Sequence, residues 1–213
     1  MTPNKEDYVK CIYELGQQSD KITNKQIAER MEVSAPAASE MTKKMIAQDL
    51  IQKDKEKGYV LLSQGLDLVA KLYRKHRLIE VLLLNHLNYS TDEVHDEAEV
   101  LEHVVSDHFI DRLDKMLGYP KECPHGGTIP APNEPLVEAH QQTLSQISEF
   151  GSYTLVRVRD SRNLLHYMEQ HHLTIGMTLQ VLEHDSFAGT FTVVANGNTF
   201  QMTDVIAERI YVE

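Results

Sequence analysis

Apolar residues in the first third of the chain recur at helical spacing and then alternate. They predict three helices, over about residues 4–17, 24–31 and 35–49. Ser34 is a good N-cap for the third helix, and Pro36 suits its first turn. Two short β-prone runs, at residues 50–54 and 59–63, flank a charged turn that contains Gly58 and predict a β-hairpin. Three helices and a hairpin in this order are typical of a winged helix-turn-helix.

Long helical patterns and then an irregular loop follow. One pattern covers about residues 65–85, and a second covers residues 90–117. The Pro- and Gly-rich segment 118–133 predicts a loop, and the polar residues after it predict a helical connector to about Gln146. A helical domain is therefore expected after the winged helix.

The last part of the chain changes to the period of strands. Runs such as residues 151–160 and 176–185 alternate, and Asn196-Gly197 is a hairpin-turn dipeptide. With one short helix between these runs, the short strands predict a small closed barrel. The fold class is thus mainly α with a small β domain. The predicted domains are a winged helix, a helical domain and a barrel, over residues 1–72, 73–146 and 147–213.

The composition is that of a soluble globular protein, with 41% hydrophobic and 25% charged residues. No apolar run approaches the roughly 20 residues that a membrane helix needs, and the polar N-terminus does not resemble a signal peptide. Two cysteines, Cys11 and Cys123, are too few for a disulfide framework. We therefore expect a cytoplasmic protein with reduced thiols and no membrane partner.

The net charge of −11 at first argues against a nucleic-acid partner. The charge is unevenly distributed, however. Residues 1–72 hold 11 basic and 11 acidic side chains, which leaves 10 basic against 21 acidic in the remainder. The predicted winged helix is neutral, and six of the 11 histidines lie among carboxylates in residues 73–125. Carboxylates mixed with imidazoles are typical ligands of divalent cations.

Carboxylates and imidazoles share helical faces in the middle of the chain. His76 and Glu80 are four residues apart and face the same way. The next helix presents a second such set: His95, Glu99, Glu102 and His103. Any single pair is more simply a solvated acidic face, but the whole set favours a metal site.

Cys123 and His125 stand two residues apart in the loop, with two glycines after them. Two soft donors this close indicate either half of a metal site or an ordinary surface turn. The chain lacks the paired Glu-x-x-His motifs of di-iron bundles, the His-Glu-x-x-His of zinc proteases, a P-loop and a dinucleotide fingerprint. His125 beside Pro124 fits shared metal ligation better than activation of a catalytic thiol. We therefore expect neither an enzyme nor a small organic substrate.

Four stretches in order carry a resemblance that covers essentially the whole chain: "VSAPAASEMTKKM", "KHRLIEVLL", "HDEAEVLEHVVSD" and "CPHGGTIP". Together they resemble the diphtheria-toxin-repressor family of metal-dependent transcription factors, and most of all its streptococcal manganese repressors. The resemblance implies a winged helix-turn-helix, a helical dimerisation and metal-binding domain, and a C-terminal SH3-like barrel of the FeoA type.

The resemblance also implies two metal sites per subunit. The first contains Glu80, Cys123, His125 and Asp160, and the second contains Asp7, Glu99, Glu102 and His103, with His76 nearby or bridging. Glu99 and Asp7 stand where iron-responsive relatives have sulfur ligands, and oxygen donors favour manganese. Lys10 stands where compact binuclear sites have a second acidic residue, so two separated sites are expected. Mn²⁺ is the expected ion, with Fe²⁺ possible and Zn²⁺ or Cd²⁺ able to occupy the sites in vitro.

A member of this family would bind palindromic double-stranded operator DNA as a metal-loaded homodimer and repress metal-uptake genes. A metal that joins the DNA-binding side to the dimerisation helices would set the spacing of the two recognition helices, which DNA requires to be about 34 Å or a multiple. The residues expected to meet DNA surround the start of the third helix: Ser34, Pro36, Ala37, Ser39, Glu40, Lys43 and Lys44. The alternative is a metal-buffering or storage protein without specific DNA binding.

Overall fold

The computed structural model describes residues 4–213, apart from the side chains of residues 91 and 92. The chain forms two compact units. One consists of residues up to 75 with residues 130–136, and the other of residues 76–129 with residues 137–213. Helix α4 (Ser63–Leu87) contributes to both. Among the described residues, no helix is both long and apolar enough to span a membrane.

The first unit has the helices and the hairpin of a winged helix-turn-helix. Its elements before α4 are α1 (Lys5–Gly16), α2 (Asn24–Arg30), α3 (Ala35–Ala47), β1 (Ile51–Asp54) and β2 (Gly58–Leu61). The two strands pair antiparallel. Apolar side chains from every helix meet in one core, which includes Ile12, Ile27 and Met45. The periodicity of the sequence therefore predicted these elements correctly.

Polar caps and one glycine set the boundaries of these elements. Thr23 and Gln26 form a reciprocal capping box at the start of α2. The Ser34 side chain accepts a hydrogen bond from Ala37 N at 3.3 Å and so begins α3. Gly58 has φ +75°, and a Cβ there would lie 1.9 Å from a backbone oxygen, so only glycine fits.

The helical part of the second unit corrects one prediction. Residues 90–117 form two helices, α5 (Thr91–Leu101) and α6 (Asp107–Met116), rather than one. A turn separates them, and the Ser106 side chain starts α6 by accepting a hydrogen bond from Phe109 N at 3.2 Å. Both helices pack on α4 through a shared core that includes Leu78, Val94 and Ile110.

The connector before the barrel corrects a second prediction. It is irregular rather than helical, and its only helical turn is the short 3₁₀ helix η1 (Leu144–Gln146). Pro135 accounts for the start of this segment, because proline removes a backbone donor and disfavours helix in the residue before it.

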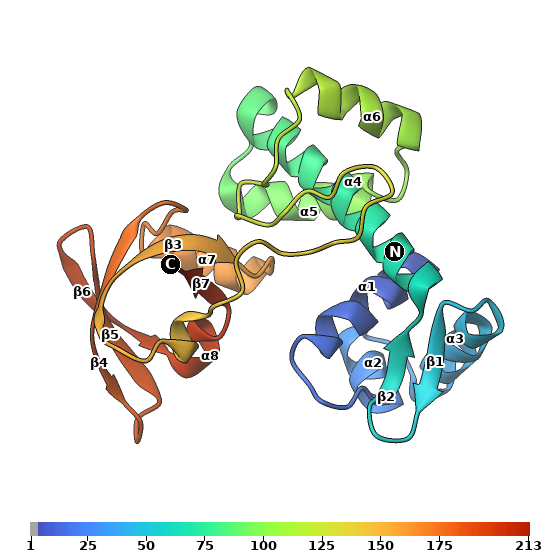
Figure 1. Cartoon of the computed structure of the whole chain (residues 1–213), viewed down its shortest axis with the longest axis horizontal. Coiled ribbons are helices and arrows are strands. Elements are labelled where there is room, and N and C mark those ends of the chain that lie inside the picture. Colours follow the sequence, from blue (N-terminus) through green and yellow to red (C-terminus); the bar gives the residue numbers. More distant parts are fainter. Residues whose placement is uncertain (1–3) are drawn as a thin grey trace. The chain divides into compact units, whose positions relative to one another are not determined.

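The C-terminal β domain is one curled antiparallel sheet in the order β6-β5-β4-β3-β7 (Figure 1). Its elements are β3 (Gly151–Val158), α7 (Arg162–Gln170), β4 (Thr178–Asp185), β5 (Thr190–Ala195), β6 (Asn198–Thr203), α8 (Asp204–Ala207) and β7 (Ile210–Val212). Register shifts in the β3–β7 and β4–β5 pairings bend the sheet. It encloses a core that includes Leu155, Leu179 and Phe191. The end of β3 leads directly to Asp160.

Candidate metal centre and DNA-binding helix

Helix α4 buries an imidazole beside a carboxylate. His76 and Glu80 are one helical turn apart, and His76 Nε2 lies 3.1 Å from Glu80 Oε1. Their side chains are only 1% and 0% exposed. Burying ionisable groups costs several kcal/mol per ion unless further partners compensate. This pair therefore requires other charges close by.

The loop of residues 121–129 presents Cys123 and His125. Gly126 N donates to Cys123 O at 2.9 Å and closes a tight turn. Gly126 has φ +76°, and a Cβ there would lie 2.0 Å from a backbone oxygen of β3. A backbone N–H of β3 also donates to His125 O at 2.9 Å. The glycine thus lets the loop pack directly on the strand that leads to Asp160.

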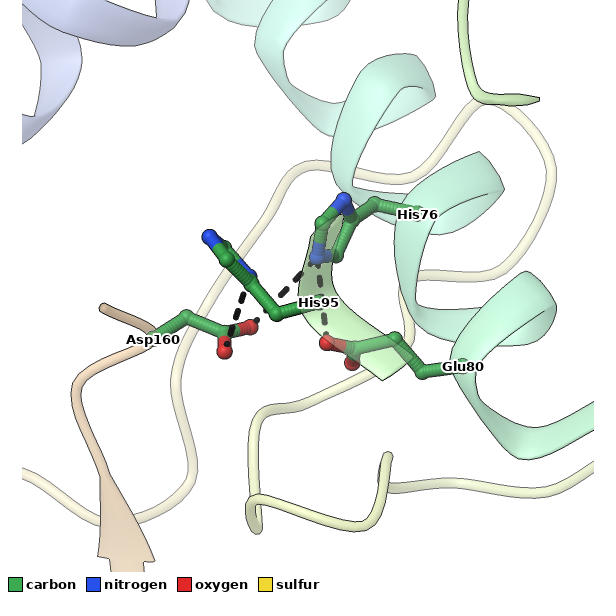
Figure 2. A group of neighbouring side chains, drawn as sticks. All are labelled: His76, Glu80, His95 and Asp160. Carbon is green, nitrogen blue, oxygen red and sulfur yellow. Dashed lines mark hydrogen bonds and ion pairs between the residues drawn. The ribbon is translucent and has the colours of Figure 1, made fainter. Parts of the chain in front are cut away.

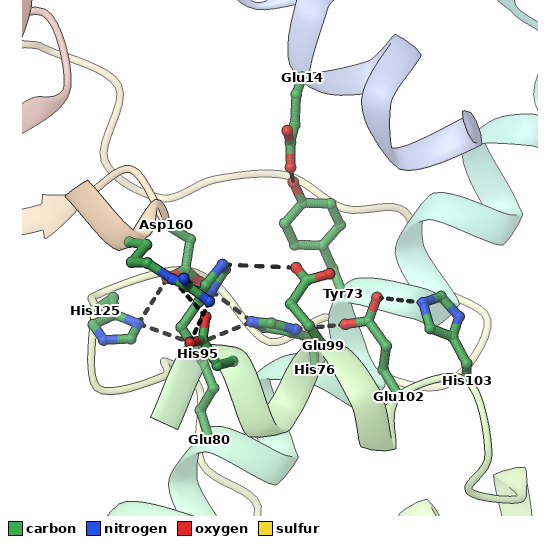
Figure 3. A network of polar contacts seen from close by, with 12 residues as sticks. Glu14, Tyr73, His76, Glu80, His95, Glu99, Glu102, His103, His125 and Asp160 are labelled. Atoms are coloured by element: carbon green, nitrogen blue, oxygen red, sulfur yellow. Dashed lines mark hydrogen bonds and ion pairs between the residues drawn. The ribbon is translucent and has the colours of Figure 1, made fainter. Parts of the chain in front are cut away.

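Asp160 completes a group with Glu80, Cys123 and His125, which we call the clasp. One ligand atom from each residue lies within 4.8 Å of the others. His125 Nδ1 lies 3.1 Å from Glu80 Oε1 and 3.1 Å from Asp160 Oδ1. Figure 3 shows Glu80, His125 and Asp160 converging. The fold therefore brings together the four residues predicted for the first metal site, and their role as ligands stays a prediction.

The charges of the clasp depend strongly on one another. Burial and the Glu80 carboxylate raise the pKa of the Cys123 thiol. Burial opposes a charge on His125, but Asp160 and Glu80 hold its pKa well above the ordinary value. Burial also opposes the ionisation of both carboxyls. Even so, His125 holds the pKa of Asp160 well below its usual range, and His125 with His76 lowers the pKa of Glu80 to about 2. Without metal, the clasp holds a thiol, an imidazolium and two carboxylates.

The clasp also contains buried polar atoms that the protein does not satisfy. Glu80 Oε2 and His125 Nε2 have no hydrogen-bond partner among the described residues. An unsatisfied buried group costs about 1–3 kcal/mol. A divalent cation fits this donor set, because two carboxylates, an imidazole and a thiol offer hard and soft ligands around one point.

A second group shares His76 with the clasp and extends along α5. His76 Nδ1 lies 2.5 Å from Glu102 Oε2. Ligand atoms of His76, Glu99 and Glu102 lie within 4.8 Å of one another. His103 Nε2 lies 3.5 Å from Glu102 Oε1. Four of the five residues predicted for the second site are therefore neighbours, and His76 contacts Glu80 as well.

His95 belongs to the same network and is absent from the predicted ligand sets. Its Nδ1 lies 3.3 Å from Asp160 Oδ1, and its Nε2 lies 3.8 Å from Glu99 Oε1. Ligand atoms of His76, Glu80, His95 and Asp160 lie within 4.8 Å of one another (Figure 2). The signal available in the sequence was the spacing of four residues between His95 and Glu99, which places both on one face of α5.

Asp7 lies in the other unit, where it caps a helix. Its carboxylate accepts a hydrogen bond from Asn4 N at 2.6 Å, and the Asn4 side chain accepts one from Asp7 N at 3.2 Å. This reciprocal capping box starts α1. Helix capping gives an acidic residue at this position a structural role, and the role of Asp7 as a ligand stays a prediction.

Helix α3 presents the residues predicted to meet DNA. Ser39 is half-buried, and the other six are exposed: Ser34, Pro36, Ala37, Glu40, Lys43 and Lys44. Lys44 Nζ lies 2.7 Å from Glu40 Oε1, and this contact lowers the pKa of the Glu40 carboxyl. Three lysines of the hairpin are also exposed: Lys53, Lys55 and Lys57. The contact of the seven residues around the start of α3 with DNA stays a prediction.

Three family models match the chain in sequence order. The N-terminal DNA-binding domain of iron dependent repressors matches residues 1–59, their metal-binding and dimerisation domain matches residues 63–131, and the FeoA domain matches residues 142–213. The structure of the manganese regulator SloR is 60% identical, with a TM-score of 0.92, over 100% of this chain and 99% of that chain. The chain belongs to the diphtheria-toxin-repressor family of iron-dependent repressors.

Other members of this repressor family match at several levels of identity. The crystal structure of ScaR with bound Zn²⁺ is 55% identical, with a TM-score of 0.95, over 99% of both chains. The diphtheria toxin repressor of Corynebacterium diphtheriae is 28% identical over 98% of this chain and 96% of that protein. The one of Corynebacterium jeikeium is 35% identical over 61% of this chain and 54% of that protein, so this match spans about half of the relative.

Membership of the diphtheria-toxin-repressor family confirms the predicted family and the predicted fold class. The family consists of metal-dependent transcriptional repressors with DNA-binding and dimerisation domains, and a FeoA-type β domain follows them here. Such proteins are transcriptional regulators. The domain boundaries predicted near residues 72 and 146 stay predictions.

Proposed function

We propose that this chain represses metal-uptake genes as a manganese-loaded homodimer bound to palindromic operator DNA. The observation that carries the proposal is the clasp, where one ligand atom from each of four side chains lies within 4.8 Å of the others. SloR is described as a manganese regulator and ScaR as a manganese-activated repressor, which supports Mn²⁺ as the native ion. Fe²⁺ is the second candidate. Zn²⁺ and Cd²⁺, each bound in a structure of ScaR, would occupy the sites in vitro.

The clasp residues come from three elements of the second unit. Glu80 projects from α4, Cys123 and His125 from the loop, and Asp160 from the end of β3. A bound ion supplies the positive charge that two buried carboxylates need. Its four ligands would then tie the helical part of this unit to the β domain. The second proposed site keeps the set implied by the resemblance: Asp7, His76, Glu99, Glu102 and His103.

Helix α3 would read the operator. Pro36 and Ala37 suit apolar contact with thymine methyl groups, and Glu40 suits acceptance from a cytosine amino group. Lys43 and Lys44 are placed for phosphate contacts. Two copies in a homodimer would offer two such helices to half-sites about 34 Å or a multiple apart. The coupling between metal binding and operator binding is reciprocal, so operator DNA would also tighten metal binding.

The repressor would work in the cytoplasm and would not act as an enzyme. The sequence contains none of the hydrolase, nucleotide-binding or di-iron motifs that an enzyme of those classes needs. The comparisons give no support to the alternative, a metal-buffering protein without specific DNA binding. The two differ in one property, because a buffer protein would not discriminate operator DNA from other DNA.

A double variant, Cys123→Ala with His125→Ala, tests the proposal. It should keep its fold and its dimer, bind one metal ion fewer per subunit, and bind operator DNA more weakly with Mn²⁺ present. His172→Ala is a suitable control, because this exposed histidine lies after α7 and outside the metal groups. Full metal stoichiometry in the double variant would refute the clasp. A wild-type chain that binds metal but no specific DNA would point to a buffer protein.

A further inference from the structure

Glu138 is a largely buried carboxylate that belongs to neither proposed metal site. Its side chain is 14% exposed, although it lies in the irregular connector. Its Oε1 lies 2.6 Å from Arg77 Nη2 and 3.4 Å from Arg157 Nη1. Its Oε2 accepts a hydrogen bond from Thr128 N at 3.0 Å. One carboxylate therefore contacts α4, β3 and the loop of residues 121–129.

These are the three elements that carry the clasp. Each contact of Glu138 lies three residues from a clasp residue: Arg77 from Glu80, Thr128 from His125, and Arg157 from Asp160. Three residues form a short and stiff connection between each contact and its clasp residue, whether in the helix, in the loop or at the end of the strand. A shift of Glu138 would thus be transmitted to every element that supplies a clasp ligand.

The partners of Glu138 are themselves held in place. A Cβ at Gly127 would lie 2.6 Å from the guanidinium carbon of Arg77, so this side chain lies flat against the loop backbone. Arg77 Nη1 also donates to Thr128 O. The Arg157 guanidinium carbon lies 3.5 Å from the centre of the Tyr211 ring. The carboxylate therefore joins groups that have little freedom to move elsewhere.

The charges of Glu138 and its two arginine partners would also affect a cation bound at the clasp. Arg77 and Arg157 have side chains only 6% and 11% exposed. Burial opposes the ionisation of Glu138, but Arg77 and Arg157 lower its pKa, so it is a carboxylate at neutral pH. Without it, two buried guanidiniums would repel each other, and both would repel a cation held by the clasp.

We propose that Glu138 is the positioning residue of the clasp, which aligns α4, the loop and β3 and neutralises the two arginines behind them. This inference rests on the proposed function, since it assumes that the clasp holds metal. Among the described residues, Glu138 forms no ion pair or hydrogen bond with a proposed ligand. It acts through Arg77, Thr128 and Arg157.

Glu138→Ala in the full-length chain tests the proposal with Co²⁺ as the probe. Thiolate-to-cobalt charge-transfer absorbance reports ligation by Cys123, and competition with Co²⁺ then gives the affinity for Mn²⁺. The variant should bind both ions at the clasp at least about tenfold more weakly, because tenfold needs only about 1.4 kcal/mol. Glu134→Ala is the matched control, since this exposed residue lies on the same connector without these contacts. It should bind Co²⁺ as the wild type does.

Two further measurements separate positioning from general stability. Acetate should restore part of the Co²⁺ affinity of Glu138→Ala by placing a carboxylate between the guanidiniums, and the metal-free circular dichroism spectrum should match that of the wild type. Wild-type Co²⁺ affinity in Glu138→Ala would overturn the proposal. So would a loss of affinity that acetate leaves unchanged and that accompanies a loss of folded structure. A wild-type chain without the cobalt–thiolate absorbance would instead refute the clasp, and this inference with it.

Discussion

The protonation state of the clasp predicts how many protons leave when metal binds. Burial and Glu80 raise the pKa of Cys123, and Asp160 with Glu80 raises that of His125, so both residues carry a proton near neutral pH. To bind a metal, the Cys123 thiol must become a thiolate and the His125 imidazolium must become a neutral imidazole, so one ion at the clasp should release about two protons. Glu80 and Asp160 release none, because their pKa values are lowered and they are already ionised. Since protons are products, affinity should rise with pH.

Isothermal titration calorimetry in buffers of different ionisation enthalpy measures this number. At pH near 7, the observed enthalpy for the first equivalent of Mn²⁺, plotted against buffer enthalpy, should give a slope of about two protons in the wild type. Cys123→Ala keeps the imidazolium and should release about one proton. A slope near zero in the wild type, or an unchanged slope in Cys123→Ala, would refute the assignment of these two ligands.

Three further predictions concern stability and operator recognition. Glu138→Gln should lower the free energy of unfolding measured by urea titration. The difference from wild type should shrink as pH falls below about 4.3, the ordinary pKa of glutamate, because a lowered pKa stabilises the fold only while the carboxylate is ionised. A pH-independent difference in the free energy of unfolding would contradict this. The double variant Lys43→Ala with Lys44→Ala should weaken binding to all DNA sequences. Measured by fluorescence anisotropy, the slope of log affinity against log salt concentration should become about 2 less steep. An unchanged slope would exclude both phosphate contacts. Glu40→Gln should shift the preferred base at one operator position from cytosine toward adenine in selection from a random library, because glutamine pairs with adenine in the major groove. The same preferred base in both proteins would remove Glu40 from base recognition.

The sequence predicted those parts of the fold that depend on local signals. Ser34 and Pro36 mark the start of α3 because capping and proline stereochemistry act within one turn. The break between α5 and α6 was missed because Val104 and Val105 continue the apolar pattern up to Ser106. The connector was predicted as helical because its polar residues suit a helix. Pro135 and the distant partners of Glu138 override that tendency.

The candidate site shows the same division between local and distant signals. The pair His76 and Glu80 was recognisable because helical spacing places both on one face. Asp160 lies far along the chain from both, so only the family resemblance could join it to them. Glu138 carries no motif, and its partner Arg77 is 61 residues away. His95 had a local signal in its spacing from Glu99, but the spacing alone does not reveal the contact with Asp160.

Operator affinity of the wild-type chain with and without Mn²⁺ tests the central claim most directly. Fluorescence anisotropy at one fixed salt concentration, with DNA from upstream of a metal-uptake operon and a scrambled duplex as control, gives both values. We predict that Mn²⁺ tightens operator binding by about 5–150-fold, the usual range of such coupling, with a much smaller effect on the scrambled duplex. Equal operator affinities with and without Mn²⁺ would contradict it.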